Sequence, residues 1–188
     1  MHQTSIKIVR AAVLFILLLI LSCGIYAFFI EPNRLIVDQE TIQVEAWPKE
    51  LSGLRIAIIG DIHTGGPFIN EKKLGRIVDL TNQQNPDLII LLGDYMSPNS
   101  WHSHRVEPEV TAAALKNLRA PLGVYAVLGN HDWWYSGIKV RRALEADGIP
   151  VLEDDVAEIK WRSTSFWLAG LADLWTRPQH IKDRKSVV

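Results

Sequence analysis

The sequence predicts a layered α/β domain that follows one membrane-spanning helix. Two observations support this fold class. Residues 11–30 contain no charged side chain, and the rest of the chain alternates short apolar runs with stretches of helical pattern. Such alternation is typical of a mostly parallel sheet with helices packed on it. The chain has 188 residues, 48% of them hydrophobic, which is the length of one ordinary domain with an appendage.

The charges are almost balanced, with 20 Lys and Arg against 21 Asp and Glu and a formal net charge of −1. Proteins that bind nucleic acid over a wide surface carry a strong positive excess, so we expect no nucleic-acid partner. The single cysteine, Cys23, excludes an internal disulfide framework and a cysteine-rich zinc site. No feature of the sequence indicates an obligate protein partner.

Residues 1–30 are predicted to anchor the chain in a membrane. The twenty residues of Ala11–Ile30, at about 1.5 Å each, are long enough to cross a hydrocarbon core of about 30 Å. Lys7 and Arg10 precede this run, which favours a cytoplasmic N-terminus and a domain outside the bacterial cytoplasmic membrane. A cleaved signal peptide is the alternative, because residues 20–24 (ILSCG) loosely resemble a lipoprotein cleavage box. The apolar run continues past Cys23, which favours a retained anchor.

Residues 31–53 are predicted to form a linker with a pair of leading strands. Leu35–Val37 and Thr41–Ala46 are rich in residues that favour strands, and Pro48 ends the second run. The main domain is expected to cover residues 54–188.

Strands and helices are expected to alternate from residue 54 onward. Buried strands are predicted at Leu54–Gly60, Asp87–Gly93 and Gly123–Gly129. Helices are predicted at Asn70–Gln84, Glu107–Ala120 and Gly137–Asp147. Asn70 is a typical N-cap residue. Beyond Pro150 the pattern predicts short strands without helices between them, at Val151–Leu152, Val156–Trp161 and Ser165–Ala169.

A polar cluster follows each of the three buried strands. In chain order the clusters are Asp61 with His63, then Asp94, then Asn130 with His131 and Asp132. Ligands bind beyond the carboxyl ends of the strands in open α/β sheets, so we expect these clusters to meet at one place. The separations are 33 residues from 61 to 94 and 36 residues from 94 to 130. Each separation leaves room for one crossover helix.

The residue types in these clusters favour a metal site. Asp61 and His63 stand two apart, so an extended backbone points both side chains the same way. A carboxylate and an imidazole together suit a first-row metal ion. Asp94 has two oxygens and can bridge two ions, and Asn130 adds a neutral carbonyl oxygen. Two such ions can clamp a phosphate and convert bound water into a nucleophile.

The residues around this predicted metal site have several possible roles. His131 can stabilise a charged transition state or protonate a leaving oxygen, and Asp132 can orient the His131 ring. The aromatic run Trp133–Tyr135 can form a wall for an acyl chain or a base, or can simply pack in the core. His102 and His104 lie in a predicted loop, either near the mouth of the site or in solvent.

The motifs D-x-H at 61–63, G-D-Y at 93–95 and G-N-H-D at 129–132 resemble those of the calcineurin-like metallophosphoesterases. The resemblance runs from about Leu35 to Asp173. It implies a four-layer α/β/β/α sandwich. The anchor followed by Glu31, together with the L-G-V-Y run at 122–125, resembles the bacterial membrane-associated branch. That branch includes phosphodiesterases and enzymes that act on UDP-2,3-diacylglucosamine, a lipid precursor.

The resemblance also implies a reaction and a set of ligands. The reaction is hydrolysis of a phosphodiester or pyrophosphate bond, with a lipid-linked substrate expected at the membrane. Two ions, Mn, Fe or Zn, are implied. Asp61 and His63 correspond to ligands of the first ion, Asp94 to the bridging ligand and Asn130 to a ligand of the second ion. His131 corresponds to the residue that assists the leaving group.

The sequence departs from the family pattern after residue 132. The family has a later histidine and a G-H-x-H motif, whereas the histidine that follows here, His180, matches neither. Site two then keeps only Asp94 and Asn130. We therefore expect a C-terminally incomplete family member whose activity is uncertain. A membrane-anchored binding module without catalysis is the alternative function, and a protein phosphatase is a third.

Overall fold

The computed structural model describes residues 2–97 and 103–176. The chain forms two compact units, Met1–Gln39 and Glu40–Val188. The first unit contains α1 (His2–Ile25), which continues into a π-helical turn (Tyr26–Ile30) and a 3₁₀ turn (Glu31–Asn33). The segment Ile6–Asn33 is long and apolar enough to cross a membrane, and its apolar stretch is not buried in the protein. The predicted N-terminal helix is therefore confirmed.

A small polar network lies where the apolar helix ends. The Tyr26 hydroxyl donates a hydrogen bond to Glu31 at 2.6 Å. Arg34 donates to the same Glu31 oxygen at 2.9 Å and to the Tyr26 hydroxyl at 3.0 Å. An amphipathic tyrosine is common where a spanning helix leaves the hydrocarbon region. This network marks the change from an apolar helix to a polar chain.

The predicted leading strands are wrong. Residues 34–55, all of them described, contain no strand and only one short helical turn, Lys49–Leu51. Side chains in the expected strands, such as Ile36 and Ile42, are exposed. A strand pair is stable only when one of its faces packs on something else, and these residues have no such support.

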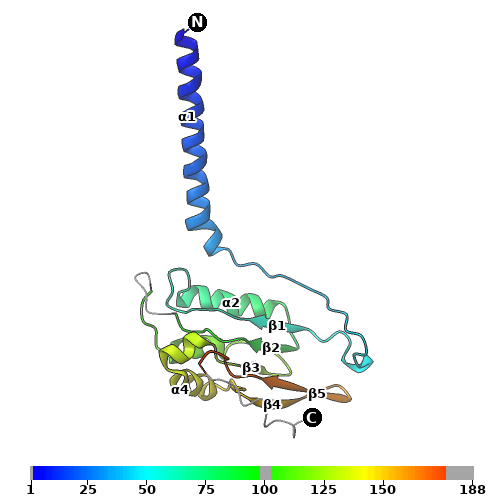
Figure 1. Ribbon diagram of the computed structural model, residues 1–188. Helices are drawn as coiled ribbons and strands as arrows, with labels where there is room; N and C mark the ends of the chain where they lie inside the picture. The colour runs from blue at the N-terminus through cyan, green and yellow to red at the C-terminus, as the bar shows by residue number, and fades with distance from the viewer. Residues whose placement is uncertain (1, 98–102, 177–188) are drawn as a thin grey trace. The chain divides into compact units, whose positions relative to one another are not determined.

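The second unit contains a parallel sheet of three strands in the order β1-β2-β3 (Figure 1). The strands are β1 (Ile56–Ile59), β2 (Leu88–Leu91) and β3 (Val124–Ala126). They alternate along the chain with α2 (Glu71–Gln83), α3 (Pro108–Leu115) and α4 (Asn130–Ala146). Ile56 pairs with Leu88, and Ile89 pairs with Val124. The α/β class is thus confirmed, and each of the three predicted buried strands contains an observed one.

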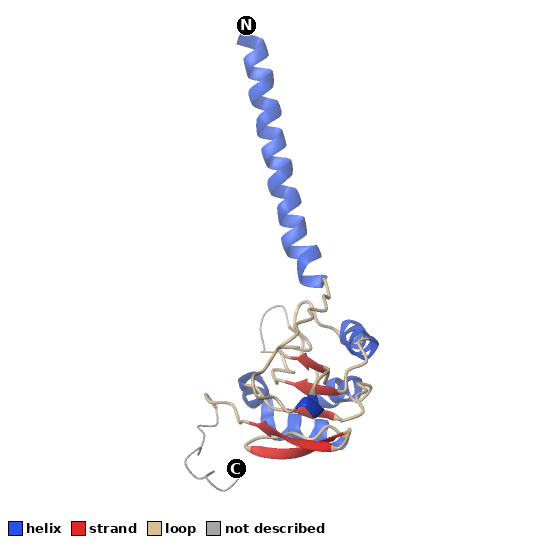
Figure 2. Ribbon diagram, turned by 90° about the vertical axis from the view of Figure 1, so that its right-hand side faces the viewer, coloured by secondary structure: helices blue, strands red, loops and turns tan. Residues whose placement is uncertain are grey.

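The helices pack on one face of this sheet (Figure 2). The core joins Ile89 and Leu91 of β2 to buried residues from all three helices: Leu74 and Val78 of α2, Ala112 and Leu115 of α3, and Val140 and Leu144 of α4. On the opposite face, Ile58 of β1 is 63% exposed. The prediction that the first strand is buried is therefore wrong for the face that carries Ile56 and Ile58. β1 is an edge strand with one open face.

The helix boundaries follow local chemistry. Asn70 caps α2 as predicted, with its side chain accepting a hydrogen bond from the Lys73 backbone N–H at 2.9 Å. α4 begins at Asn130, earlier than the predicted start at Gly137. The helix is kinked at Ser136, where φ is 175° and ψ is 88°. Kinks are common at Ser–Gly pairs, and here the kink falls where the sequence predicted the helix to begin.

An antiparallel hairpin follows, formed by β4 (Asp155–Trp161) and β5 (Thr164–Gly170). Val151 also forms a parallel bridge to Ala126 beside β3. The change from alternating elements to strands without helices is confirmed in residues 151–170. The described residues of the second unit thus contain a helix-covered parallel sheet and a separate two-stranded sheet.

Candidate metal and phosphoester site

The loops after β1 and β2 run side by side at the carboxyl edge of the sheet. The backbone N–H of Asp61 donates to Gly93 at 3.2 Å, and that of His63 donates to Asp94 at 2.9 Å. Asp61, His63 and Asp94 all have left-handed backbone conformations, with φ of 52°, 48° and 55°. Such conformations are uncommon for residues other than glycine and cluster at functional sites. The backbone is therefore shaped to turn these side chains toward one place.

Two glycines allow the loops after β2 and β3 to touch. Gly93 has a φ of +90°, and a Cβ there would collide with the backbone nitrogen of Gly129. A Cβ on Gly129 would collide with the carboxylate of Asp94. The absence of side chains at both positions lets Asp94 lie against the N-terminus of α4. The partial positive charge of a helix N-terminus stabilises a carboxylate there.

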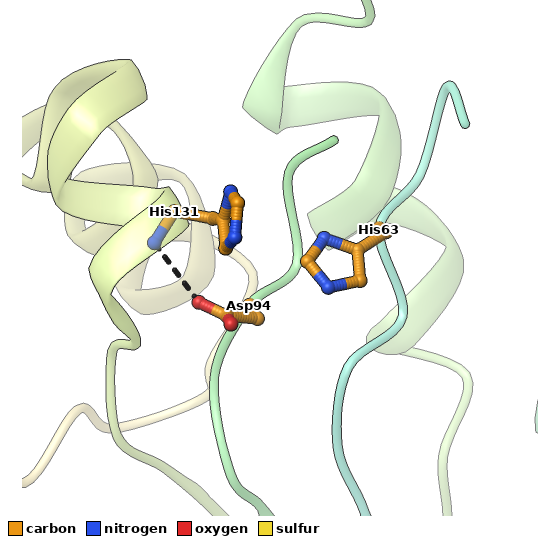
Figure 3. Close-up of side chains that lie close together, drawn as sticks. All are labelled: His63, Asp94 and His131. Carbon is orange, nitrogen blue, oxygen red and sulfur yellow. Dashed lines mark hydrogen bonds between the residues drawn. The ribbon is translucent and has the colours of Figure 1, made fainter. Parts of the chain in front are cut away.

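His63, Asp94 and His131 come together at the ends of three strands (Figure 3). Each offers one potential ligand atom, and these atoms all lie within 4.8 Å of one another. All three residues are half-buried. The backbone N–H of His131 donates to Asp94 Oδ1 at 3.0 Å, as the dashed line in Figure 3 shows. The prediction that the three strand-end clusters meet is confirmed for these residues.

The hydrogen bond of His63 leaves one of its ring nitrogens available to an ion. Nδ1 lies 3.2 Å from the carbonyl oxygen of Met96. A carbonyl can only accept, so Nδ1 carries a proton, and in the neutral ring Nε2 keeps its lone pair. Nε2 lies 3.7 Å from Asp61 Oδ1, and the Asp61 side chain is largely exposed. A backbone carbonyl that orients an imidazole in this way is the usual support for a metal-binding histidine.

His131 also has an available ring nitrogen. Its Nδ1 is buried and has no hydrogen-bond partner among the described residues. The ring lies edge-on to that of His63, with centroids 4.8 Å apart. A buried polar atom without a partner is rare and usually marks a site for a missing ion, water or ligand. The residues therefore fit the metal chemistry that the motifs imply.

Asn130 is the first residue of α4 and is half-buried. Its side-chain amide makes no hydrogen bond to any residue in the described ranges, so its oxygen is available to an ion. The roles of Asn130 and Asp61 as ligands stay predictions.

Asp132 has a different role from the predicted one. Its side chain is completely buried. Its two oxygens accept hydrogen bonds from four backbone N–H groups: those of Gly129 at 3.0 Å, Asp94 at 2.8 Å, Tyr95 at 2.8 Å and Met96 at 3.1 Å. The expectation that it orients the His131 ring is wrong, because the His131 Nδ1 has no such partner. Asp132 instead joins the loops that carry Asp94 and Asn130.

Burial raises the pKa of the Asp132 carboxyl to about 6, while its bonds to backbone N–H groups lower it and the nearby charge of Asp94 raises it. The group is therefore ionised at neutral pH. In the loop that carries Asp94, the buried Tyr95 hydroxyl donates a hydrogen bond to the carbonyl of Val127 at 2.8 Å. Burial raises the pKa of the Tyr95 hydroxyl well above its ordinary value, so this hydroxyl stays a donor and ties the loop after β2 to the residue that follows β3.

Of the two loop histidines, His104 is described and is not part of the group formed by His63, Asp94 and His131. His104 is exposed, and its backbone N–H donates to Gly65 at 2.9 Å. His102 and His180 lie outside the described residues.

Sequence reasoning missed a second polar cluster beside α4. Arg141 donates to Glu153 at 2.7 Å, and the Glu153 side chain is only 4% exposed. The indole N–H of Trp133 donates to the other oxygen of Glu153 at 2.9 Å. Arg141 is followed by a second arginine on α4, a pattern typical of a solvated helix surface. No local pattern reveals its partner, which comes from a separate loop.

A parallel α/β sheet that gathers imidazole and carboxylate groups at three strand ends is suited to bind metal ions that activate water for hydrolysis. Sequence comparison identifies the family. The chain belongs to the calcineurin-like phosphoesterases, whose family model matches residues 54–176. Members of this family hydrolyse phosphoester bonds with the help of metal ions.

Several curated proteins are similar to the chain. It is 34% identical over 146 residues to a transmembrane protein with metallophosphoesterase domain from Danio rerio. The matched stretch covers 76% of the chain and 32% of that relative. It is 33% identical over 113 residues to the UDP-2,3-diacylglucosamine pyrophosphatase LpxG of Chlamydia trachomatis, covering 58% and 32%. It is 29% identical over 124 residues to the uncharacterized metallophosphoesterase YkuE of Bacillus subtilis, covering 65% and 42%.

The chain thus spans about a third of the length of the Danio rerio and Chlamydia trachomatis relatives. None of the solved structures matched the chain significantly.

Proposed function

We propose that this chain is a metal-dependent phosphoester hydrolase held at a membrane. The observation that carries the proposal is the meeting of His63, Asp94 and His131 at the carboxyl ends of three parallel strands. A site of this composition at this edge of an α/β sheet favours binding of a phosphate through metal ions.

The ligands are assigned as follows. Asp61 and His63 would hold one ion, Asp94 would contribute to both, and Asn130 would contribute to a second. Bound Mn, Fe or Zn ions would neutralise the phosphate and activate water as a nucleophile. The protein orients His63 through the Met96 carbonyl and holds Asp94 against the first turn of α4. These contacts fix the ligands before any ion binds, which lowers the cost of assembling the site.

His131 acts on the leaving group in this proposal. Its Nδ1 has no hydrogen-bond partner among the described residues, and its ring lies beside that of His63. A protonated imidazole in this position can donate its proton to the leaving oxygen of the phosphoester. Asp94 accepts a hydrogen bond from the His131 backbone N–H in the first turn of α4, and this bond helps to position the ring.

The substrate is proposed to be a phosphodiester or pyrophosphate that belongs to a lipid. The apolar segment Ile6–Asn33 and the chlamydial relatives named UDP-2,3-diacylglucosamine pyrophosphatase support this choice. The charges at Lys7 and Arg10 favour a cytoplasmic N-terminus and a domain outside the cytoplasmic membrane. Alkaline phosphatase fused after Val188 should then be active in bacterial cells. Fluorescence of green fluorescent protein fused at the same position, without alkaline phosphatase activity, would show instead that the domain lies in the cytoplasm.

The hydrolase proposal is tested with the full chain purified in detergent. With Mn²⁺ added, it should hydrolyse bis(p-nitrophenyl) phosphate, and Asp94→Asn should abolish this activity. Asp79→Asn is the matched control, because Asp79 is an exposed carboxylate on α2 and is not part of the candidate metal-binding group. Absence of hydrolysis by the unchanged chain with Mn²⁺, Fe²⁺ and Zn²⁺ would contradict the proposal.

A non-catalytic binding module is the second candidate function. Two residues, Asp94 and Asn130, are assigned to the second ion. This is a small ligand set for a catalytic ion, and it favours a module that binds without catalysis. A module of this kind would bind metal and phosphate but would not hydrolyse the ester. Phosphate binding that requires metal, in a chain that shows no turnover, would support this alternative.

A further inference from the structure

Three aromatic residues follow His131 on the first turns of α4, and two of them are held by the protein itself. Trp133 donates from its indole N–H to the buried Glu153 at 2.9 Å. The Tyr135 hydroxyl donates to Glu107 at 3.2 Å and accepts from Arg105 at 3.1 Å, and the Arg105 guanidinium also lies over the Tyr135 ring. These contacts fix the helix backbone on both sides of Trp134.

Trp134 is the residue between these two anchors, and it is 61% exposed. Its ring meets that of His131 edge-on, with centroids 4.7 Å apart and planes at 72°. Its indole N–H makes no hydrogen bond to any residue in the described ranges. Trp134 thus lies between two hydrogen-bonded neighbours and exposes most of its side chain to solvent directly beside the His131 imidazole.

The kink at Ser136 ends this turn just after the aromatic run. Gly137, at the kink, leaves room for the Trp133 ring, because a Cβ there would collide with it. Trp133 can therefore fold inward while its neighbour faces outward. The kink at Ser136 and the space at Gly137 therefore favour opposite orientations for the two adjacent tryptophans. The exposure of Trp134 follows from this helix geometry.

We propose that Trp134 is a specificity-determining residue that contacts a large apolar or aromatic group on the leaving side of the phosphate. This inference rests on the proposed function, because it uses His131 as the residue nearest the leaving oxygen. Exposed tryptophan faces bind acyl chains through area burial and nucleobases through stacking. The shared chemistry is an apolar surface attached to a phosphate, and compact phosphates gain nothing from it.

The test measures dissociation constants of phosphate monoesters for the Mn²⁺-loaded full chain by titration calorimetry. The probes are methyl phosphate, dodecyl phosphate and uridine 5′-monophosphate. Trp134→Ala should weaken binding of at least one of the two larger probes by about 3- to 10-fold and leave methyl phosphate unchanged. Trp134→Phe should restore most of the loss. An effect on dodecyl phosphate alone indicates an acyl chain, and an effect on uridine 5′-monophosphate alone indicates a nucleobase.

Trp167→Ala is the matched control, because Trp167 is 67% exposed on β5 and follows the site motifs by more than thirty residues. It should change none of the three constants. The same loss for methyl phosphate as for the larger probes, or no loss for any probe, would overturn the role of Trp134 alone. Failure of the unchanged chain to bind any of the three probes would overturn both this role and the proposed function.

Discussion

The buried carboxylate of Asp132 holds the loop after β2 against the first turn of α4. A buried charge is tolerated only when its oxygens are fully hydrogen-bonded, and here four backbone N–H groups provide this. Three of the four belong to the loop that carries Asp94. The position of the proposed shared ligand, Asp94, therefore depends on a buried residue whose two oxygens are both bonded to backbone N–H groups.

Replacement of Asp132 by Asn should destabilise the domain by about 2–4 kcal/mol. The new amide group would turn an N–H donor toward backbone donors and leave at least one of them unsatisfied in the core. Urea unfolding at neutral pH, followed by tryptophan fluorescence, measures the change. All seven tryptophans lie in the second unit, so the signal reports that unit rather than α1. Asp79→Asn is the control, and equal stability of the two variants would contradict the role of Asp132.

His131 is expected to act on the substrate rather than to hold an ion. His131→Ala should lower kcat for bis(p-nitrophenyl) phosphate by about 10²- to 10⁴-fold, the usual contribution of a positioned general acid. The metal content should stay at the level of the unchanged chain, because Asp61, His63 and Asp94 remain. Loss of the metal together with the activity would show instead that the Nδ1 of His131 is a ligand.

Among the elements, β1 and β2 show how much a strand's burial depends on its place in the sheet. Both strands consist of apolar residues, and the sequence predicted both to be buried. β2 lies in the centre and is buried, whereas β1 lies at the edge and exposes Ile58. An apolar run predicts a strand well, but it does not show whether one face or both faces are covered.

This difference predicts unequal effects of one substitution. Ile89→Ala should cost about 2–5 kcal/mol, because Ile89 is fully buried against the helices and its loss leaves a cavity. Ile58→Ala removes the same atoms from a side chain that is mostly exposed, so its cost should be well under half as large. The free energies of unfolding of the two variants, from the same fluorescence experiment, test this. Equal costs would mean that something covers the open face of β1.

Local sequence patterns did not predict the start of α4. The cap of α2 was predicted because Asn70 and its bond to Lys73 are neighbours in the sequence. The sequence predicted the next helix to begin at Gly137, whereas in the structure the G-N-H-D residues already form the cap and first turn of α4. Asp132 stabilises that turn together with a loop almost forty residues away, and no local pattern contains this information.

For the molecule as a whole, the sequence predicted the α/β class, the apolar N-terminal helix and the meeting of His63, Asp94 and His131. These features follow from periodicity and from the rule that strand ends share one edge of a sheet. The buried bond between Arg141 and Glu153, the four contacts of Asp132 and the open face of β1 could not be predicted. Each depends on which distant segments become neighbours after folding.

The metal content of the purified full chain tests the central claim most directly. After incubation with Mn²⁺, Fe²⁺ or Zn²⁺ and removal of free ions, elemental analysis should find at least one bound ion per chain. Asp94→Asn should lose it, because Asp94 is the ligand shared between both proposed positions, while the exposed control Asp79→Asn should keep it. A chain that is folded by tryptophan fluorescence but binds none of these ions would contradict the assignment of this site as a metal centre.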